Sequence, residues 1–323
     1  MATIPSHSHQ DTEVQGVDAA QVGALAWTGE RLVPTESGQT AVEHLHRYAL
    51  ATDLARDKIV LDIASGEGYG ANLLAQVAEQ VVGVDIAHDA VAHARAKYCR
   101  NNLTFAMGEC AKIPLKTSSV DLVVSFETIE HHGDHEEMAA EFARVLRPDG
   151  ALIISSPNRY EYSDLPKYKN PFHVAELYRD QFEALLRTHF RNVCLFGQRV
   201  SAGSYVAPLQ PPAEGLDIAY QTYTGGFTLI QNHPGIDRPV YFIAVASNGR
   251  LPAIPGGLFE GESFLLRQKD QVIVDLNDHV RTLQAQLAEK EQHNKRLQAF
   301  SDAVRQTWAY HFYRKFIKPL RSQ

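Results

Sequence analysis

The sequence has few cysteines and no long apolar segment. Its 323 residues include three cysteines, at positions 99, 110 and 194, and they form no C-x-x-C pair. This scarcity argues against a disulfide framework or a zinc knuckle and fits reduced thiols. No run of apolar residues approaches the roughly eighteen that a transmembrane helix needs.

Basic residues are also too few for a general nucleic-acid-binding surface. The formal net charge is −7, so we expect no nucleic-acid partner. The first ten residues lack both the basic region and the apolar core of a signal peptide, which predicts a cytoplasmic protein. With 44% hydrophobic residues, the chain can build a full core.

A glycine-rich turn follows the first strongly apolar segment. Residues 59–63 are mainly apolar, and Gly66, Gly68 and Gly70 follow. Such glycines let the backbone pass close to a ligand, and the next helix offers free N–H groups to an anionic group. Asp85 ends the next apolar segment, where a carboxylate can accept hydrogen bonds from both ribose hydroxyls. The pattern predicts a nucleoside ligand.

The glycine spacing indicates which nucleoside it is. A dinucleotide fingerprint needs G-x-G-x-x-G, whereas this loop reads G-x-G-x-G, with Asp62 four residues before the first glycine. The loop resembles motif I of the class I S-adenosylmethionine (SAM) methyltransferases. The resemblance continues in register through residues 108–110, 120–126 and 147–150. It implies an enzyme that uses SAM as its cofactor.

The same resemblance implies which residues hold SAM. The backbone of the glycine-rich loop is expected near the methionyl portion, at Ala64, Gly66 and Gly68. The end of the second strand is expected to bind the ribose through Asp85 and the adenine through Ile86. Further expected contacts are Glu109, where related enzymes usually carry Asp, its neighbour Cys110, and Phe126 and Glu127 after the fourth strand. Asp62 is expected to orient the loop.

Strands and helices alternate over most of the chain. Apolar segments predict strands near 58–63, 80–85, 102–106, 121–126, 150–155, 192–197 and 240–246. Amphipathic segments predict helices near 40–57, 70–78, 88–99, 135–146 and 175–188. The predicted fold is therefore α/β, with a doubly wound, mostly parallel seven-stranded sheet of the Rossmann-like class I type over residues 26–250. Residues 1–25 are polar and aperiodic, which predicts disorder.

Two insertions interrupt the alternation, at about 157–175 and 198–238. Loops at the carboxyl ends of parallel strands form the ligand crevice, so the first should cover the acceptor. The second is expected to be a long structureless loop, rich in Gly, Pro, Gln and Tyr, which is uncommon unless functional. Both are interpreted as substrate lids, suited to a polar acceptor that bears hydroxyls. The alternative is an ordinary packed lid whose aromatic residues are buried.

Histidines follow the fourth strand at the expected site of methyl transfer. Transfer from a sulfonium methyl needs an acceptor lone pair held in line, and a hydroxyl acceptor must also lose its proton. Histidine titrates in the range that suits this task. His131 or His132 is the preferred base and His173 the second candidate. In the alternative interpretation, the Glu-His pair caps the next helix.

A metal site in this segment is a weaker interpretation. His131, His132, Asp134 and His135 carry suitable donor groups. Positions this close in sequence rarely converge on one ion, so no metal is predicted.

Further segments resemble a bacterial subgroup of methyltransferases associated with glycosyltransferases of surface-polysaccharide synthesis. They are residues 29–34, 43–48, 126–132 and 170–173. This resemblance implies O-methylation of a sugar or glycan. Two alternatives remain open, an acceptor that is a quinone, lipid or other small molecule, and a non-catalytic scaffold. A nucleotide-sugar oxidoreductase is disfavoured by the glycine spacing.

The C-terminal part predicts assembly rather than catalysis. From Ile273, apolar residues recur at steps of three and four through Leu276, Leu283 and Leu287, which predicts a coiled coil over 265–308 and a homo-oligomer. The alternative is a single amphipathic helix that folds back on the catalytic domain.

The last residues are basic and aromatic. Residues 305–323 contain five basic and no acidic side chains, and the tail at 309–323 carries most of them. Such a tail suits an anionic membrane surface, and we expect peripheral association with the inner face of the membrane or with glycan-assembly proteins. The alternative is docking to a partner protein.

Overall fold

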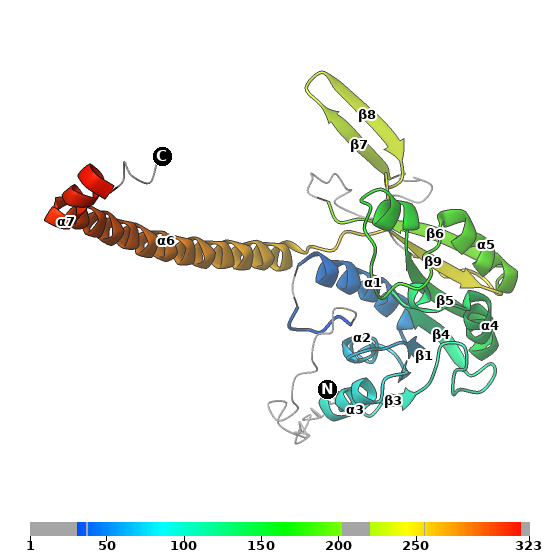
Figure 1. The fold of residues 1–323 in the computed structure, drawn as a ribbon. Helices are drawn as coiled ribbons and strands as arrows, with labels where there is room; N and C mark the ends of the chain where they lie inside the picture. Colours follow the sequence, from blue (N-terminus) through cyan, green and yellow to red (C-terminus); the bar gives the residue numbers. More distant parts are fainter. Residues whose placement is uncertain (1–30, 37, 202–219, 255, 318–323) are drawn as a thin grey trace, which may run out of the picture. The chain divides into compact units, whose positions relative to one another are not determined.

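The computed structural model describes residues 31–36, 38–201, 220–254 and 256–317. The chain divides into two compact units, Met1–Phe264 and Leu265–Gln323. The first contains the α/β fold and the second is helical (Figure 1). The segment 1–25, for which the sequence predicts disorder, lies outside the described residues.

The first unit has the alternation that the sequence predicts. Its helices are α1 (Gln39–Ala55), α2 (Tyr69–Leu74), α3 (His88–Lys97), α4 (His135–Val145) and α5 (Arg179–His189). Its main strands are β1 (Ile59–Ile63), β2 (Gln80–Asp85), β3 (Leu103–Met107), β4 (Val120–Ser125), β5 (Leu146–Pro157), β6 (Asn192–Gln198) and β9 (Tyr241–Ser247). Short turns of helix lie at η2 (Ile129–His131) and η3 (Tyr160–Asp164).

These seven strands form one sheet in the order β3-β2-β1-β4-β5-β9-β6. The first five are parallel, and β9 runs antiparallel to both β5 and β6. The predicted mostly parallel seven-stranded sheet is therefore confirmed. The chain leaves β1 toward β2 on one side and returns to β4 on the other, which makes the carboxyl ends of β1 and β4 the topological switch point where such sheets bind ligands.

Two hydrophobic layers cover the sheet. One joins α1, α2 and α3 to strand residues such as Val60 and Val124. The other joins α4 and α5 to the opposite strand face, which includes Leu61 and Val123. Because successive strand residues point to opposite faces, a continuous apolar strand fills both layers. This explains why β1 and β4 are almost entirely apolar, and why a buried Asp62 in β1 is unusual.

The prediction of a structureless loop over 198–238 is wrong where the structure describes it. Strands β7 (Gln221–Gly226) and β8 (Leu229–Pro234) form an antiparallel hairpin, visible in Figure 1. Residues that strands favour, Tyr and Thr before Gly225 and Gly226 and Phe, Thr, Leu and Ile after them, flank this glycine pair, which favours a hairpin. Gly225 has φ 132°, which suits glycine. Residues 202–219 lie outside the described part of the chain.

The second unit consists mainly of one long helix. Helix α6 (Glu262–Gln306) is followed by α7 (Trp308–Phe312) and the turn η4 (Tyr313–Ile317). The predicted helix is present, and it ends where the Thr307 side chain caps α7 by accepting from the amide of Tyr310. None of the helices in the described ranges is long and apolar enough to cross a membrane. The coiled coil stays a prediction.

Gly70 fixes the packing of α1 on α2. A Cβ built on Gly70 would lie 2.0 Å from the Tyr48 ring, which is itself buried against Tyr69 and Phe126. Gly70 therefore serves helix packing, whereas Gly66 and Gly68 have positive φ in the loop.

We predict that Gly70→Ala lowers the free energy of unfolding by about 1–3 kcal/mol, because the added Cβ would displace the buried Tyr48 ring from its contacts with Tyr69 and Phe126. Urea denaturation measures the change. Gly133→Ala is the matched control, since its added Cβ would approach nothing closer than Val174 at 4.0 Å. Equal losses in the two variants would show that the contact between Gly70 and Tyr48 does not limit the packing.

Candidate functional site

The backbone is strained at the ends of two neighbouring central strands. Ala64, directly after β1, has φ 58°, and Glu127, shortly after β4, has φ 48°. Both lie in the left-handed region, which non-glycine residues seldom adopt and which clusters at functional sites. Gly66 and Gly68 continue the unusual backbone, at φ 55° and 96°. The strain is located at the topological switch point of the sheet.

Asp85 holds the glycine-rich loop against the end of β2. Its Oδ2 accepts from the amide of Gly66 at 2.8 Å, and its Oδ1 accepts from the amide of Ala87 at 2.9 Å. A carboxylate has about four acceptor positions, so it can accept further hydrogen bonds from a ligand. Asp85 is 6% exposed, and the next residue, Ile86, is 67% exposed. A carboxylate that can accept hydrogen bonds and an exposed apolar side chain are therefore adjacent at the end of β2.

The turn after β3 completes this side of the site. The amide of Gly108 donates to the carbonyl of Asp85 at 3.1 Å, which places residues 108–110 beside the end of β2. Glu109 is exposed, whereas Cys110 is half-buried. Burial and the nearby Asp85 raise the pKa of the Cys110 thiol to about 12, so this thiol stays protonated at neutral pH. Cys110 thus contributes packing rather than thiolate chemistry.

Asp62 lies beneath the loop rather than at the surface of the site. The Tyr48 hydroxyl donates to Asp62 Oδ1 at 3.2 Å. Burial raises the pKa of the Asp62 carboxyl to about 7 despite this hydrogen bond. Phe126 packs edge-on against the same tyrosine, with ring centroids 5.1 Å apart, and is 7% exposed. Asp62 and Phe126 thus support the loop and α1 from within the core.

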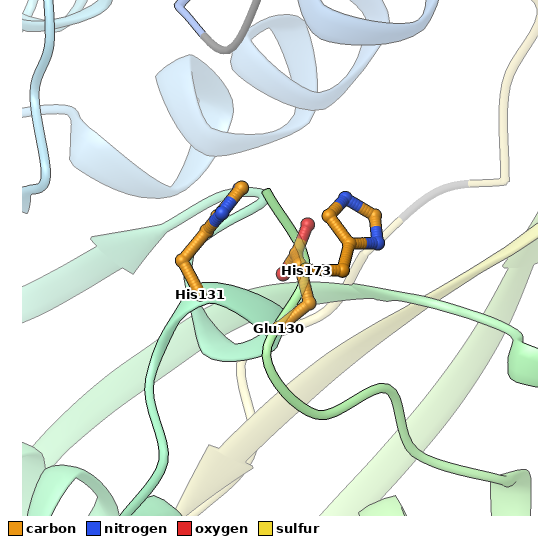
Figure 2. Close-up of side chains that lie close together, drawn as sticks. All are labelled: Glu130, His131 and His173. Atoms are coloured by element: carbon orange, nitrogen blue, oxygen red, sulfur yellow. The ribbon is translucent and has the colours of Figure 1, made fainter. Parts of the chain in front are cut away.

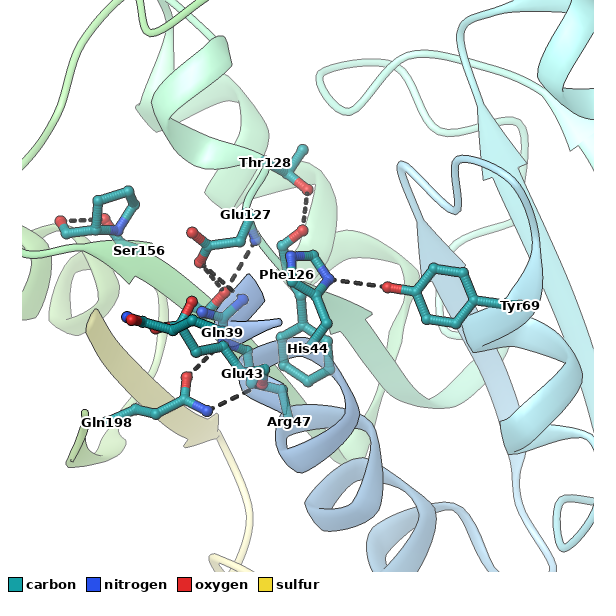
Figure 3. A network of polar contacts seen from close by, with 12 residues as sticks. Gln39, Glu43, His44, Arg47, Tyr69, Phe126, Glu127, Thr128, Ser156 and Gln198 are labelled. Atoms are coloured by element: carbon teal, nitrogen blue, oxygen red, sulfur yellow. Dashed lines mark hydrogen bonds and ion pairs between the residues drawn. The ribbon is translucent and has the colours of Figure 1, made fainter. Parts of the chain in front are cut away.

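The buried Arg47 connects helix α1 with residues near three strands of the sheet (Figure 3). Arg47 Nη1 lies 3.3 Å from Glu127 Oε1, and Arg47 Nε donates to Gln198 Oε1 at 2.7 Å. The guanidinium also lies 4.5 Å from the ring centroid of Tyr241. Glu127 is held from the other side by the Ser155 hydroxyl, which donates to it at 2.7 Å. The strained residue after β4 is therefore fixed by two partners.

Glu130, His131 and His173 converge beyond the end of β4 (Figure 2). One donor atom from each of the three lies within 4.8 Å of the others. The amides of Val174 and Ala175 donate to the carbonyl of Glu130 at 2.8 and 3.1 Å, which holds the first lid segment against η2. Burial, and secondarily the nearby Glu127, raise the pKa of the Glu130 carboxyl well above its usual range.

His132 has a different environment from its neighbour. Its Nδ1 accepts from the amide of Asp134 at 2.9 Å, and Asp134 caps α4 by accepting from the amide of Glu137 at 3.1 Å. Of the three histidines that the sequence singles out, the structure brings together His131 and His173. It places His132 in the turn that leads into α4.

Comparison with known proteins agrees with this geometry. Residues 61–154 match the family described as a methyltransferase domain. A probable S-adenosylmethionine-dependent methyltransferase of Mycolicibacterium smegmatis is 40% identical over 176 residues, which make up 53% of this chain and 67% of the relative. A protein of the same description from Mycobacterium tuberculosis is 39% identical over 188 residues, covering 57% of this chain and 67% of the relative. The chain belongs to the SAM-dependent methyltransferases.

A solved structure with a similar fold is the YcgJ protein of Bacillus subtilis. It is 22% identical, with a TM-score of 0.43, and the match covers 48% of this chain and 71% of that one. The family assignment rests on the sequence relatives and not on this similarity.

The residues at the strand ends of this methyltransferase fit SAM. The left-handed backbone at Ala64 and Gly66, the spare acceptor positions of Asp85 and the uncovered Ile86 suit the methionyl, ribose and adenine portions in turn. When bound, SAM supplies an electrophilic methyl group on its sulfonium. Asp85, Ile86, Ala64 and Gly66 would hold it, with Glu109 at the adenine edge.

Sequence reasoning did not single out several residues that build this site. Arg47 and Tyr48 were expected only within the predicted helix near 40–57, and the burial of a charged side chain on α1 has no local sequence signal. Glu130 stands beside His131 in sequence, which is a usable signal. Its proximity to His173 depends on how the lid folds back, which the sequence does not reveal.

We predict that Asp85→Ala weakens SAM binding about ten- to a hundredfold, because a charge-assisted hydrogen bond and the anchor of the Gly66 amide are lost together. Isothermal titration calorimetry measures the affinity. Glu79→Ala is the matched control, since Glu79 is exposed and directly precedes β2, at the end of the strand opposite Asp85. Unchanged affinity in Asp85→Ala would remove this carboxylate from the cofactor site.

Proposed function

We propose that this methyltransferase transfers the methyl group of SAM to a hydroxyl of a sugar or glycan in surface-polysaccharide synthesis. The convergence of Glu130, His131 and His173 beyond the end of β4 carries the proposal. Imidazole and carboxylate groups at this position can bind an acceptor hydroxyl and assist the loss of its proton, which an O-methylation requires. Glu127, fixed by Arg47 and Ser155, lies between this cluster and the end of β4 in sequence.

The lid beside the cluster supports a polar acceptor. Tyr162 stacks on His173, with ring centroids 5.2 Å apart, and lies edge-on to Tyr168 at 5.9 Å. Tyr168 is 51% exposed and Tyr160 is 53% exposed. Tyrosine offers an apolar face together with a hydroxyl, a combination that suits the C–H faces and hydroxyl groups of a sugar ring. The side-chain amide of Asn170 belongs to the same segment, and its Nδ2 donates to the Tyr162 hydroxyl at 3.3 Å.

A lipid acceptor is the second candidate. A fatty-acid O-methyltransferase of Mycolicibacterium smegmatis is 26% identical over 145 residues, which cover 52% of that relative.

A panel of acceptors assayed with isotope-labelled SAM separates the two candidates. One set contains sugar nucleotides and glycan termini, and the other contains fatty acids and quinones. Labelling of a sugar hydroxyl supports the proposal, whereas labelling confined to the second set contradicts it.

We predict that His131→Asn and His173→Asn each lower turnover on the hydroxyl acceptor by roughly a hundredfold while SAM affinity is kept, because the cluster acts on the acceptor. His132→Asn is the matched control and should stay within a few-fold of wild type. Calorimetry with SAM and single-turnover assays give the two readouts. A larger loss for His132→Asn than for the other two variants would contradict this assignment.

We also propose that the second unit assembles the enzyme through a homo-oligomeric coiled coil. The apolar positions of the repeat are exposed along α6, including Leu276 at 64%, Leu283 at 50% and Leu287 at 60%. A row of exposed leucines on one helix favours burial against another copy.

The exposed Arg314 and Lys315 support contact with an anionic membrane surface or with glycan-assembly proteins. Lys318 and Arg321, which belong to the same predicted surface, lie outside the described residues.

We predict that Leu283→Asp separates the copies, because each buried leucine is worth about 1.5–3 kcal/mol and a carboxylate in the seam costs more. Sedimentation velocity measures the change. Ala285→Asp adds the same charge two positions away, off the seam, and should leave the assembly intact. If the two variants sediment alike, as oligomers or as monomers throughout, the coiled coil is not the assembly element.

A further inference from the structure

The Glu130 carboxylate is buried without the partners that such a group normally has. The residue is 1% exposed, and neither Oε1 nor Oε2 has a hydrogen-bond partner among the described residues. Buried carboxylates without partners are strongly disfavoured and call for a role. Figure 2 shows this carboxylate between the imidazoles of His131 and His173.

Both imidazoles are oriented as metal ligands usually are. His131 Nδ1 lies 2.9 Å from the carbonyl oxygen of Phe172, and His173 Nδ1 lies 2.5 Å from Glu176 Oε1. Because a carbonyl and a carboxylate accept, each Nδ1 is the donor in these contacts, so a metal ion would bind each neutral ring through Nε2. Metal-binding histidines typically donate their second ring N–H to a carbonyl or carboxylate in this way.

Asn170 confirms the tautomer of His173. Its Oδ1 accepts from the amide of Phe172 at 3.0 Å, so its Nδ2 faces His173 Nε2, also at 3.0 Å. An amide nitrogen donates, and Nε2 is therefore the acceptor. An ion bound at Nε2 would replace this one amide contact.

The surrounding charges favour a cation. Among the described residues, the named charges that act on Glu130 come from the carboxylates of Glu127 and Glu176 and the guanidinium of Arg47. Arg47 is already paired with Glu127. A divalent ion bound here would therefore lie among carboxyl groups, and the nearby guanidinium already has a carboxylate partner.

We propose that Glu130, His131 and His173 form a binding site for one divalent transition-metal ion. Two imidazoles and one carboxylate suit Zn²⁺ or Mn²⁺ better than Mg²⁺. Their donor atoms lie within 4.8 Å of one another, and a small inward movement gives each the metal distance of about 2.0–2.2 Å. Such an ion would lower the pKa of a bound hydroxyl, a role that rests on the proposed function.

Metal binding is measured on the full-length chain without SAM or acceptor, so its outcome is independent of the glycan proposal. The chain is treated with a chelator, desalted and titrated with Zn²⁺, Mn²⁺ or Mg²⁺, with calorimetry and elemental analysis of the retained metal. We expect one Zn²⁺ or Mn²⁺ per chain and weaker binding of Mg²⁺. Glu130→Gln and His173→Asn should each weaken binding by a hundredfold or more, and Glu176→Gln by about ten- to a hundredfold.

His132→Asn is the matched control and should bind metal as the wild type does. Circular dichroism verifies that each variant is folded. X-ray absorption of the Zn²⁺-loaded wild type needs no variant and should show two imidazoles bound to the ion. No stoichiometric metal, equal binding by all variants, or an absorption spectrum without imidazole ligands would overturn the proposal.

Discussion

The ion pair between Arg47 and Glu127 is the interaction on which the site depends. Arg47 is fully buried, and a buried guanidinium is tolerated only with close partners. Its contacts reach Glu127 after β4, Gln198 at the end of β6 and Tyr241 at the start of β9. One side chain from α1 thus fixes the carboxyl end of β4 to the antiparallel edge of the sheet. Removing Glu127 would leave the buried guanidinium of Arg47 without this ion-pair partner.

This constraint explains why strain is tolerated at Glu127. Its left-handed backbone is unfavourable, but its carboxylate is held by Arg47 and by the Ser155 hydroxyl, which also accepts from its amide at 2.9 Å. The turn that follows carries Glu130 and His131 in η2. The lid then closes over this turn through two amides that donate to the Glu130 carbonyl. The glycine-rich loop, the contacts of Arg47 and the cluster of Glu130, His131 and His173 therefore lie at the carboxyl ends of the central parallel strands.

Much of the sheet could be predicted from the sequence, because strands buried on both faces are continuous apolar segments between turn signals. The G-x-G-x-G loop and Asp85 could be predicted for the same local reason, since backbone geometry and a strand end define them. The hairpin β7–β8 was missed because its strands are exposed and their few apolar residues, such as Leu229 and Ile230, do not form the continuous apolar segments of the main sheet. The pairing of His131 with His173, rather than with His132, depends on backbone hydrogen bonds between segments over forty residues apart, which no local pattern encodes.

The central claim is that the carboxyl ends of the central parallel strands bind SAM and that the cluster of Glu130, His131 and His173 lies beside its methyl group. A crystal structure of the full chain with S-adenosylhomocysteine tests it most directly. The account predicts the ribose on Asp85, the methionyl portion along Ala64 and Gly66, and the sulfur facing the side of the site that carries Glu127 and His131. A cofactor bound elsewhere, or one whose sulfur is directed away from that cluster, would contradict the account.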